Sequence, residues 1–448
     1  MLEQQTPLLL AEAIAHLDKG FEHLPAFETP VDAVAMRPIL RELAERLRDN
    51  FPYPHPQYVG QMIKPPHPIA RVAYALAQQV NPNNHALDGG RATSALEKEA
   101  VAGLAAMFGW EGHLGHLTSG GTLGNLEALF VANKLHPGKT ILASSQAHYT
   151  HSRLCGVLGI SFETVPVDAG GRMDLDALEV RLKAGGVGTV VATVGTTATG
   201  SVDPLPEILG RAAAAGARVH VDAAYGGYFG LAEGLGAAAR AAFEALATEV
   251  ASVVIDPHKH GLQPYGCGAV LFRDPSVGRF YVHDSPYTYF TSNELHLGEI
   301  SLECSRPGAS AAALWATQRL LPLVRGGAFA GELTAAHANA RRFADRLRGE
   351  GRWIVPFAPD LDIVVWACGG SALRASAVST RSRSLFHEAR ARDLHLALAT
   401  LPVAWFPEID DDAQGSVTVL RSCLMRSEHG AWFDRIFSLL DEAHAATL

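Results

Sequence analysis

The chain of 448 residues has few cysteines, no cluster of positive charge and no long apolar run. Its five cysteines lie far apart and form no CxxC pair, which argues against a disulfide framework and a cysteine-based zinc site. The 37 basic residues are outnumbered by 46 acidic ones, a balance that argues against a nucleic-acid-binding surface. No stretch approaches the roughly 18 uninterrupted apolar residues of a membrane-spanning helix.

Signals for export and for metal binding are also missing. The first residues, MLEQQTPLLLAEAIAHL, are acidic where a signal peptide is basic, and they contain no long apolar core. The 20 histidines show no tight ligand spacing, so we expect no metal site. The hydrophobic fraction of 48% and the charged fraction of 19% are those of an ordinary globular protein. We therefore expect a cytoplasmic enzyme that acts on a small molecule.

The order of predicted elements divides the chain into three parts. Residues 1–60 predict amphipathic helix followed by a segment rich in proline and histidine, where prolines interrupt regular structure. Residues 61–315 predict short apolar strands that alternate with helices, which favours a mostly parallel sheet covered on both faces. Residues 316–448 predict helices with a few strands, typical of a smaller α+β domain.

A glycine-rich turn before a predicted helix is a candidate anion site. In TSGGTLGN, Gly121 and Thr122 stand at the start of the helix, where free backbone N–H groups and a hydroxyl can bind a phosphate. An ordinary turn with a helix cap gives the same pattern. The spacing matches neither a Walker loop nor a dinucleotide-binding fingerprint.

Two charged residues follow strands that are expected to be neighbours in the sheet. Asp222 ends the apolar run RVHVD, and Lys259 follows SVVI in DPHKH. A buried carboxylate is costly unless it is paired, so Asp222 either caps a loop or faces a cation. His148 follows a third strand, TILASS. A lysine amine, a carboxylate, an imidazole and an anion cradle at one sheet edge match the needs of pyridoxal phosphate.

The ordered motifs TSGGTLGN, HYTH, ATVGTTATGSVDP, HVDAAYGG, DPHKH and YGCGAVLF resemble those of the group II pyridoxal-phosphate-dependent amino-acid decarboxylases. The resemblance covers about residues 50–325. It implies an aspartate-aminotransferase-like α/β fold, with a mostly parallel seven-stranded central sheet and a smaller C-terminal α+β domain. It also implies a homodimer with active sites at the subunit interface, in which residues 1–60 pack on the partner.

The resemblance also implies roles for individual residues. Lys259 would carry the cofactor as a Schiff base, and Asp222 would face the pyridinium nitrogen. His148 would stack above the ring, with Ala224 beneath it. The remaining cofactor contacts would be Gly121, Thr122, Thr197, His258 and Ser305. The sequence departs from the family at His260, where many members carry tryptophan or another bulky residue.

The reaction implied by the resemblance is loss of CO2 from an L-amino acid to give the amine. A loop tyrosine or His148 would return a proton. Of the tyrosines we favour Tyr287 over Tyr289, although either aromatic ring could instead pack at a dimer contact. Arg421 is a candidate contact for a substrate carboxylate or a member of a structural salt bridge. The sequence leaves open whether the substrate is acidic, aromatic or basic.

The sequence is compatible with two other classes of function. SRPGAS is also similar to the sphingosine-phosphate-lyase branch, so a different carbon–carbon lyase or an aldehyde synthase on the same cofactor is the main alternative. A non-catalytic binding protein is the second. The joint retention of Lys259, Asp222 and His148 argues against it, because a buried carboxylate without a function is a cost.

Overall fold

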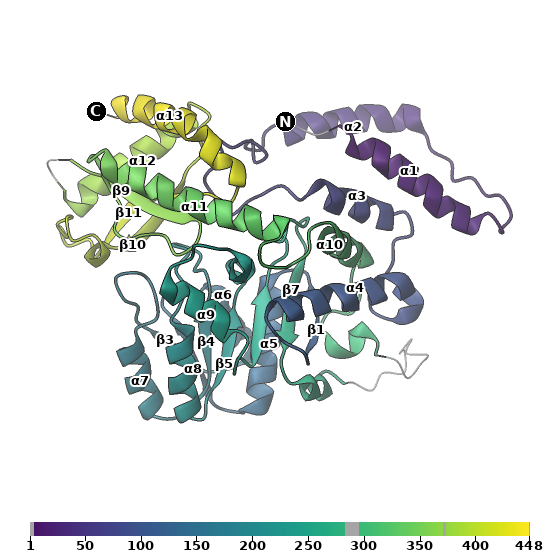
Figure 1. Ribbon diagram of the computed structural model, residues 1–448, viewed down its shortest axis with the longest axis horizontal. Coiled ribbons are helices and arrows are strands. Elements are labelled where there is room, and N and C mark those ends of the chain that lie inside the picture. The colour runs from purple at the N-terminus through teal and green to yellow at the C-terminus, as the bar shows by residue number, and fades with distance from the viewer. Residues whose placement is uncertain (1–3, 283–294, 371–372, 448) are drawn as a thin grey trace.

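A seven-stranded sheet forms the centre of the larger part of the molecule (Figure 1). The computed structural model describes residues 4–282, 295–370 and 373–447. The strand order is β1-β7-β6-β5-β4-β2-β3, and only β7 runs antiparallel to its neighbours. The strands are β1 (Leu114–Thr118), β2 (Thr140–Ser144), β3 (Phe162–Val165), β4 (Val187–Thr193), β5 (Arg218–Asp222), β6 (Ser252–Ile255) and β7 (Gly268–Phe272). The predicted mostly parallel sheet is confirmed.

Helices cover both faces of this sheet. Successive side chains of a strand point to opposite faces, and β4 shows the result. Val190 packs in one apolar cluster with Leu178 and Ile208, whereas Val191 packs in another with Leu129 and Leu154. The helices of this part are α4 (Leu87–Met107), α5 (Gly121–Leu135), α6 (Thr150–Leu158), α7 (Leu175–Lys183), α8 (Leu205–Ala214), α9 (Ala237–Ala245) and α10 (Gly308–Leu320). Burial on both faces explains why these strands are continuously apolar.

The C-terminal part contains a four-stranded antiparallel sheet in the order β10-β11-β9-β8. Its strands are β8 (Trp353–Ile354), β9 (Ile363–Cys368), β10 (Ala397–Pro402) and β11 (Ser416–Cys423), and its helices are α11 (Ala328–Gly349), α12 (Ala375–Arg390) and α13 (Phe433–Ala445). Trp366 of β9 is fully buried against Phe343 of α11. The predicted boundary after residue 315 falls within α10, and the three-part division stays a prediction.

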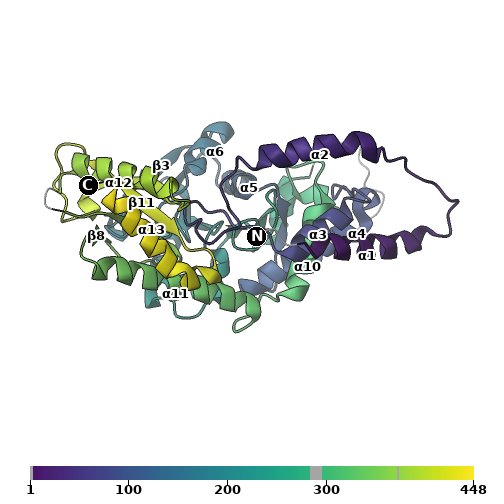
Figure 2. The ribbon, with the colours of Figure 1, turned by 90° about the horizontal axis from the view of Figure 1, so that it is seen from above.

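The first helices extend away from the rest of the molecule, as the view from above shows (Figure 2). Helix α1 (Thr6–Asp18) lies next to α3 (Pro68–Ala77), and α2 (Ala33–Leu47) runs along the outside. Neither α1 nor α2 has a buried residue. Short 3₁₀ helices span Lys19–Phe21, Gly227–Leu231, Pro275–Phe280, Leu297–Ile300, Val403–Trp405 and Ser427–Trp432. In the part of the chain that the structure describes, every helix is too short or too polar to cross a membrane.

Candidate active site

A cavity of about 460 Å³ lies where strands β4, β5 and β6 end. Parallel strands bring their carboxyl ends to one edge of a sheet, so residues far apart in sequence meet there. Lys259, Asp222 and His148 all line this cavity. It is also lined by the predicted cofactor contacts Gly121, Thr122, Thr197, Ala224 and His258. Strands β5 and β6 pair directly, as expected from the positions of Asp222 and Lys259.

The lysine amine has an acidic partner that the sequence analysis did not single out. Nζ of Lys259 lies 3.1 Å from Oδ2 of Asp256, the residue that follows β6. Asp256 is buried, and Nε2 of His258 lies 3.5 Å from the same oxygen. The sequence signal for this contact was the acidic residue three positions before the lysine. This ion pair holds the Lys259 amine at the cavity wall as long as no ligand binds the amine.

The start of α5 provides a place for an anion. No side chain of the described residues caps this helix, and its first residues line the cavity, so their backbone N–H groups can bind a ligand there. A Cβ atom on Gly121 would lie 2.8 Å from Oδ2 of Asp256, so only glycine fits at this close approach. Burial lowers the pKa of His258, and its Nδ1 has no partner among the described residues. These groups fit a phosphate.

The carboxylate of Asp222 is ionised and held on both oxygens. Nε2 of His151 lies 2.9 Å from Oδ2, and the Ala224 backbone N–H donates to Oδ1 at 3.1 Å. Burial acts to raise the pKa of Asp222, but the His151 hydrogen bond and the nearby Lys259 amine outweigh it, and the pKa falls below its ordinary value. A buried negative charge at the cavity wall fits a cationic ring nitrogen. His151 was not predicted from the sequence.

The imidazole of His148 is oriented by its neighbour. Its Nδ1 lies 2.8 Å from Oγ1 of Thr150 and accepts a hydrogen bond from the Thr150 backbone N–H at 3.3 Å. Burial lowers the pKa of His148, so the ring is neutral and its proton sits on Nε2. Thr197 and Ala224 complete this side of the cavity.

Other predicted residues lie elsewhere. Ser305 is exposed, accepts a hydrogen bond from Nδ2 of Asn83 at 3.2 Å, and does not line the cavity within the described chain. Tyr287 and Tyr289 lie outside the described residues. Arg421 lines an adjoining cleft of about 380 Å³ that shares His148 and Thr197 with the cavity.

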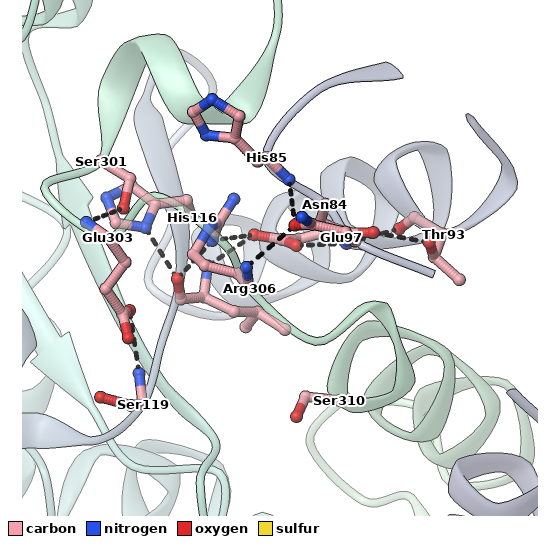
Figure 3. A network of polar contacts seen from close by, with 12 residues as sticks. Asn84, His85, Thr93, Glu97, His116, Ser119, Ser301, Glu303, Arg306 and Ser310 are labelled. Atoms are coloured by element: carbon pink, nitrogen blue, oxygen red, sulfur yellow. Dashed lines mark hydrogen bonds and ion pairs between the residues drawn. The ribbon is translucent and has the colours of Figure 1, made fainter. Parts of the chain in front are cut away.

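A buried polar network ties the segment around Ser305 to the anion site (Figure 3). Nη1 of Arg306 lies 2.8 Å from Oε1 of Glu97 and also donates to the Leu117 carbonyl at 2.6 Å. The Ser119 backbone N–H, beside the glycine turn, donates to the Glu303 carboxylate at 3.1 Å. The network therefore fixes the end of β1, from which the glycine turn starts.

The unexpected His260 also has a structural role. Its Nε2 lies 3.2 Å from Oδ2 of Asp362, and both side chains are buried. The Tyr225 hydroxyl donates to the other oxygen of Asp362 at 2.7 Å. Asp362 directly precedes β9. His260, the residue after Lys259, therefore connects the cavity to the C-terminal sheet through its contact with the Asp362 carboxylate. A bulky apolar residue at 260 would leave the Asp362 carboxylate without this partner.

A lysine, a buried carboxylate and a helix N-terminus meet at one edge of the sheet. They fit the aldehyde, the ring nitrogen and the phosphate of a phosphorylated pyridine aldehyde, so the fold and the site are those of an α/β enzyme that uses such a cofactor. Residues 39–368 match the pyridoxal-dependent decarboxylase conserved domain, and the chain belongs to this family. It is a pyridoxal-phosphate-dependent amino-acid decarboxylase.

Individual relatives agree with this assignment. The probable L-tyrosine/L-aspartate decarboxylase of Methanoculleus marisnigri is 29% identical over 328 residues, which cover 73% of this chain and 85% of that protein. The L-aspartate decarboxylase of Thermococcus kodakarensis is 30% identical over 62% of this chain and 71% of its own length. The crystal structure of mouse CSAD has a TM-score of 0.79 at 20% identity and covers 97% of this chain and 91% of that chain. This last likeness shows the fold.

Proposed function

We propose that the enzyme converts an L-amino acid to the corresponding amine and CO2, with Lys259 holding the cofactor as a Schiff base. The observation that carries this proposal is the meeting of Lys259 and Asp222 in one cavity at the ends of paired strands. Relatives named for L-tyrosine and L-aspartate decarboxylation support an amino-acid substrate.

The residues of the cavity have distinct tasks in this reaction. When bound, pyridoxal phosphate accepts the electron pair that the Cα–carboxylate bond releases as CO2 departs. Asp222 would hold a negative charge against the ring nitrogen. Lys259 would bind the cofactor in place of its contact with Asp256, and the first turn of α5 would bind the phosphate together with His258. Nε2 of His148 holds a proton at the cavity wall, where it can pass to the substrate carbon.

Arg421 is the proposed contact for a substrate carboxylate. Arg421 is 4% exposed, yet its Nε and Nη2 have no partner among the described residues. Nη1 donates to the neutral amide oxygen Oε1 of Gln61 at 3.0 Å, and Arg421 forms no ion pair within the described part of the chain. A buried guanidinium without a counter-charge is costly, and a carboxylate in the adjoining cleft would supply one. We therefore propose a substrate whose carboxylate reaches Arg421.

A panel of L-amino acids tests the reaction and this contact together. We expect release of CO2 and the amine from at least one of L-aspartate, L-glutamate and L-tyrosine. Arg421→Met should lower kcat/KM for that substrate about 10-fold or more, because a charge-assisted hydrogen bond is lost. Arg392→Met, which removes an arginine paired with Glu388 on the surface, is the control. Aldehyde or carbon–carbon cleavage products without amine would refute the decarboxylation.

We also propose a homodimer in which the N-terminal helices pack on the partner subunit. Met36, Ile39, Leu40, Leu43 and Leu47 of α2 recur at helical spacing, and all are exposed. An apolar stripe of this size is unusual on the surface of a monomer, and a second copy of the chain would cover it.

Charged substitutions in this stripe test the dimer. Leu40→Asp combined with Leu43→Asp should shift the protein from dimer toward monomer in sedimentation equilibrium, because each aspartate would be buried without a partner. Arg37→Asp, which places an aspartate at a polar position of the same helix, should leave the dimer intact. A wild-type protein that is monomeric at micromolar concentration would contradict the proposal.

A further inference from the structure

A histidine on α6, His151, contacts the carboxylate of Asp222. His151 is fully buried, and its Nε2 lies 2.9 Å from Oδ2 of Asp222. The other oxygen accepts from the Ala224 backbone N–H. The pair therefore joins the first turns of α6 to the end of β5, and it leaves the carboxylate only its cavity side for a ligand.

The surroundings of His151 indicate which of its nitrogens carries a proton. Nδ1 is buried and has no partner among the described residues. A proton there would be a buried donor without an acceptor, which costs more than an unpaired ring lone pair. The arrangement therefore favours a neutral ring that donates through Nε2.

A second histidine behind Asp222 is also neutral. Nε2 of His220 lies 2.8 Å from Oδ1 of Asn125, and Nδ1 lies 2.9 Å from Oγ of Ser252. Burial lowers the pKa of His220 to about 3. Its ring centroid is 6.5 Å from that of His151. His220 therefore adds no positive charge beside the His151–Asp222 pair.

We propose that His151 is a positioning residue that fixes Asp222 with a neutral hydrogen bond and preserves its negative charge, so that the site selects a cofactor with a protonated ring nitrogen. The inference rests on the proposed contact between Asp222 and that nitrogen. A charged histidine at this place would neutralise Asp222 and remove the reason for a cation to bind. A neutral donor orients the carboxylate and leaves one full charge facing the cavity.

Binding of two cofactor forms to the apoprotein tests this role. One is pyridoxal 5′-phosphate, and the other is 1-deazapyridoxal 5′-phosphate, in which C–H replaces the ring nitrogen. We expect His151→Phe to weaken binding of the first about 10-fold or more and binding of the second less than about 2-fold, because only the first can respond to Asp222. His151→Gln, which retains an N–H donor at a similar reach, should restore most of the difference. Equal losses for both compounds would show a merely structural role and overturn the inference.

Asp222→Asn separates this inference from the proposed function. If Asp222→Asn does not discriminate between the two compounds, the assigned contact of Asp222 is wrong. If Asp222→Asn discriminates and His151→Phe does not, only the role of His151 is wrong. Should His151→Phe fail to unfold cooperatively, ¹⁵N spectra of the wild-type apoprotein decide: a neutral ring protonated on Nε2 is expected, and an imidazolium at pH 7 refutes the inference.

Discussion

Replacing Lys259 with alanine is expected to lower kcat for amine formation by about 10³-fold or more, because no other amine lines the cavity in the described chain. The same change should remove the absorbance band near the visible edge that a Schiff base on Lys259 would produce. Both quantities are measured on protein purified with excess pyridoxal phosphate, so that loss of cofactor affinity alone does not explain the result.

The matched control for this change is Lys139→Ala. Lys139 is exposed and far from the cavity lining, so the variant should retain the wild-type rate and spectrum. A Lys259→Ala protein that keeps the absorbance band would show that another amine carries the cofactor. A protein that loses the band and keeps the rate would contradict covalent binding as a requirement for the reaction.

Replacing Arg306 with methionine is expected to lower the free energy of unfolding by about 3–5 kcal/mol, because the buried Glu97 carboxylate loses its cationic partner. Glu97 would still accept hydrogen bonds from Nδ2 of Asn84 and from the Leu117 backbone N–H. Those two donors do not replace a positive charge in a buried site. Urea denaturation of wild-type and variant protein measures the difference.

Two controls distinguish the effect of breaking the buried Arg306–Glu97 pair from the effect of removing any arginine. Arg319 and Glu99 form a pair at 3.7 Å that is largely exposed, and Arg319→Met should change stability by less than about 1 kcal/mol. The double variant Glu97→Leu with Arg306→Met should recover part of the loss, because it removes the unpaired carboxylate but leaves two donors without an acceptor. An Arg306→Met protein as stable as the Arg319→Met protein would show that the Arg306–Glu97 ion pair contributes no net stability.

The sheet was predictable because its strands are buried on both faces and therefore read as continuous apolar runs. The same regularity placed Asp222 and Lys259 at the ends of adjacent strands, and β5 pairs with β6 as expected. Glycines before a helix predicted the candidate anion site, and this turn lines the cavity.

The partners of the predicted residues could not be read from the sequence. His151 is one of 20 histidines, and nothing local distinguishes it until α6 lies beside the end of β5. Asp256 is near Lys259 in sequence, but acidic residues are common in loops. Only the folded loop shows that the Asp256 carboxylate contacts the Lys259 amine. Asp362 lies more than 100 residues after His260, so only the packing of two sheets reveals their contact.

The His260–Asp362 contact limits how this enzyme can be recombined with its relatives. A chimera that joined the large α/β part of this chain to the C-terminal sheet of a relative without an acid at the position of Asp362 would inherit only one member of the pair. The remaining side chain would then be a buried polar or charged group without its counterpart. Residues 225, 260 and 362 should therefore be exchanged as a unit in any hybrid enzyme built from this chain.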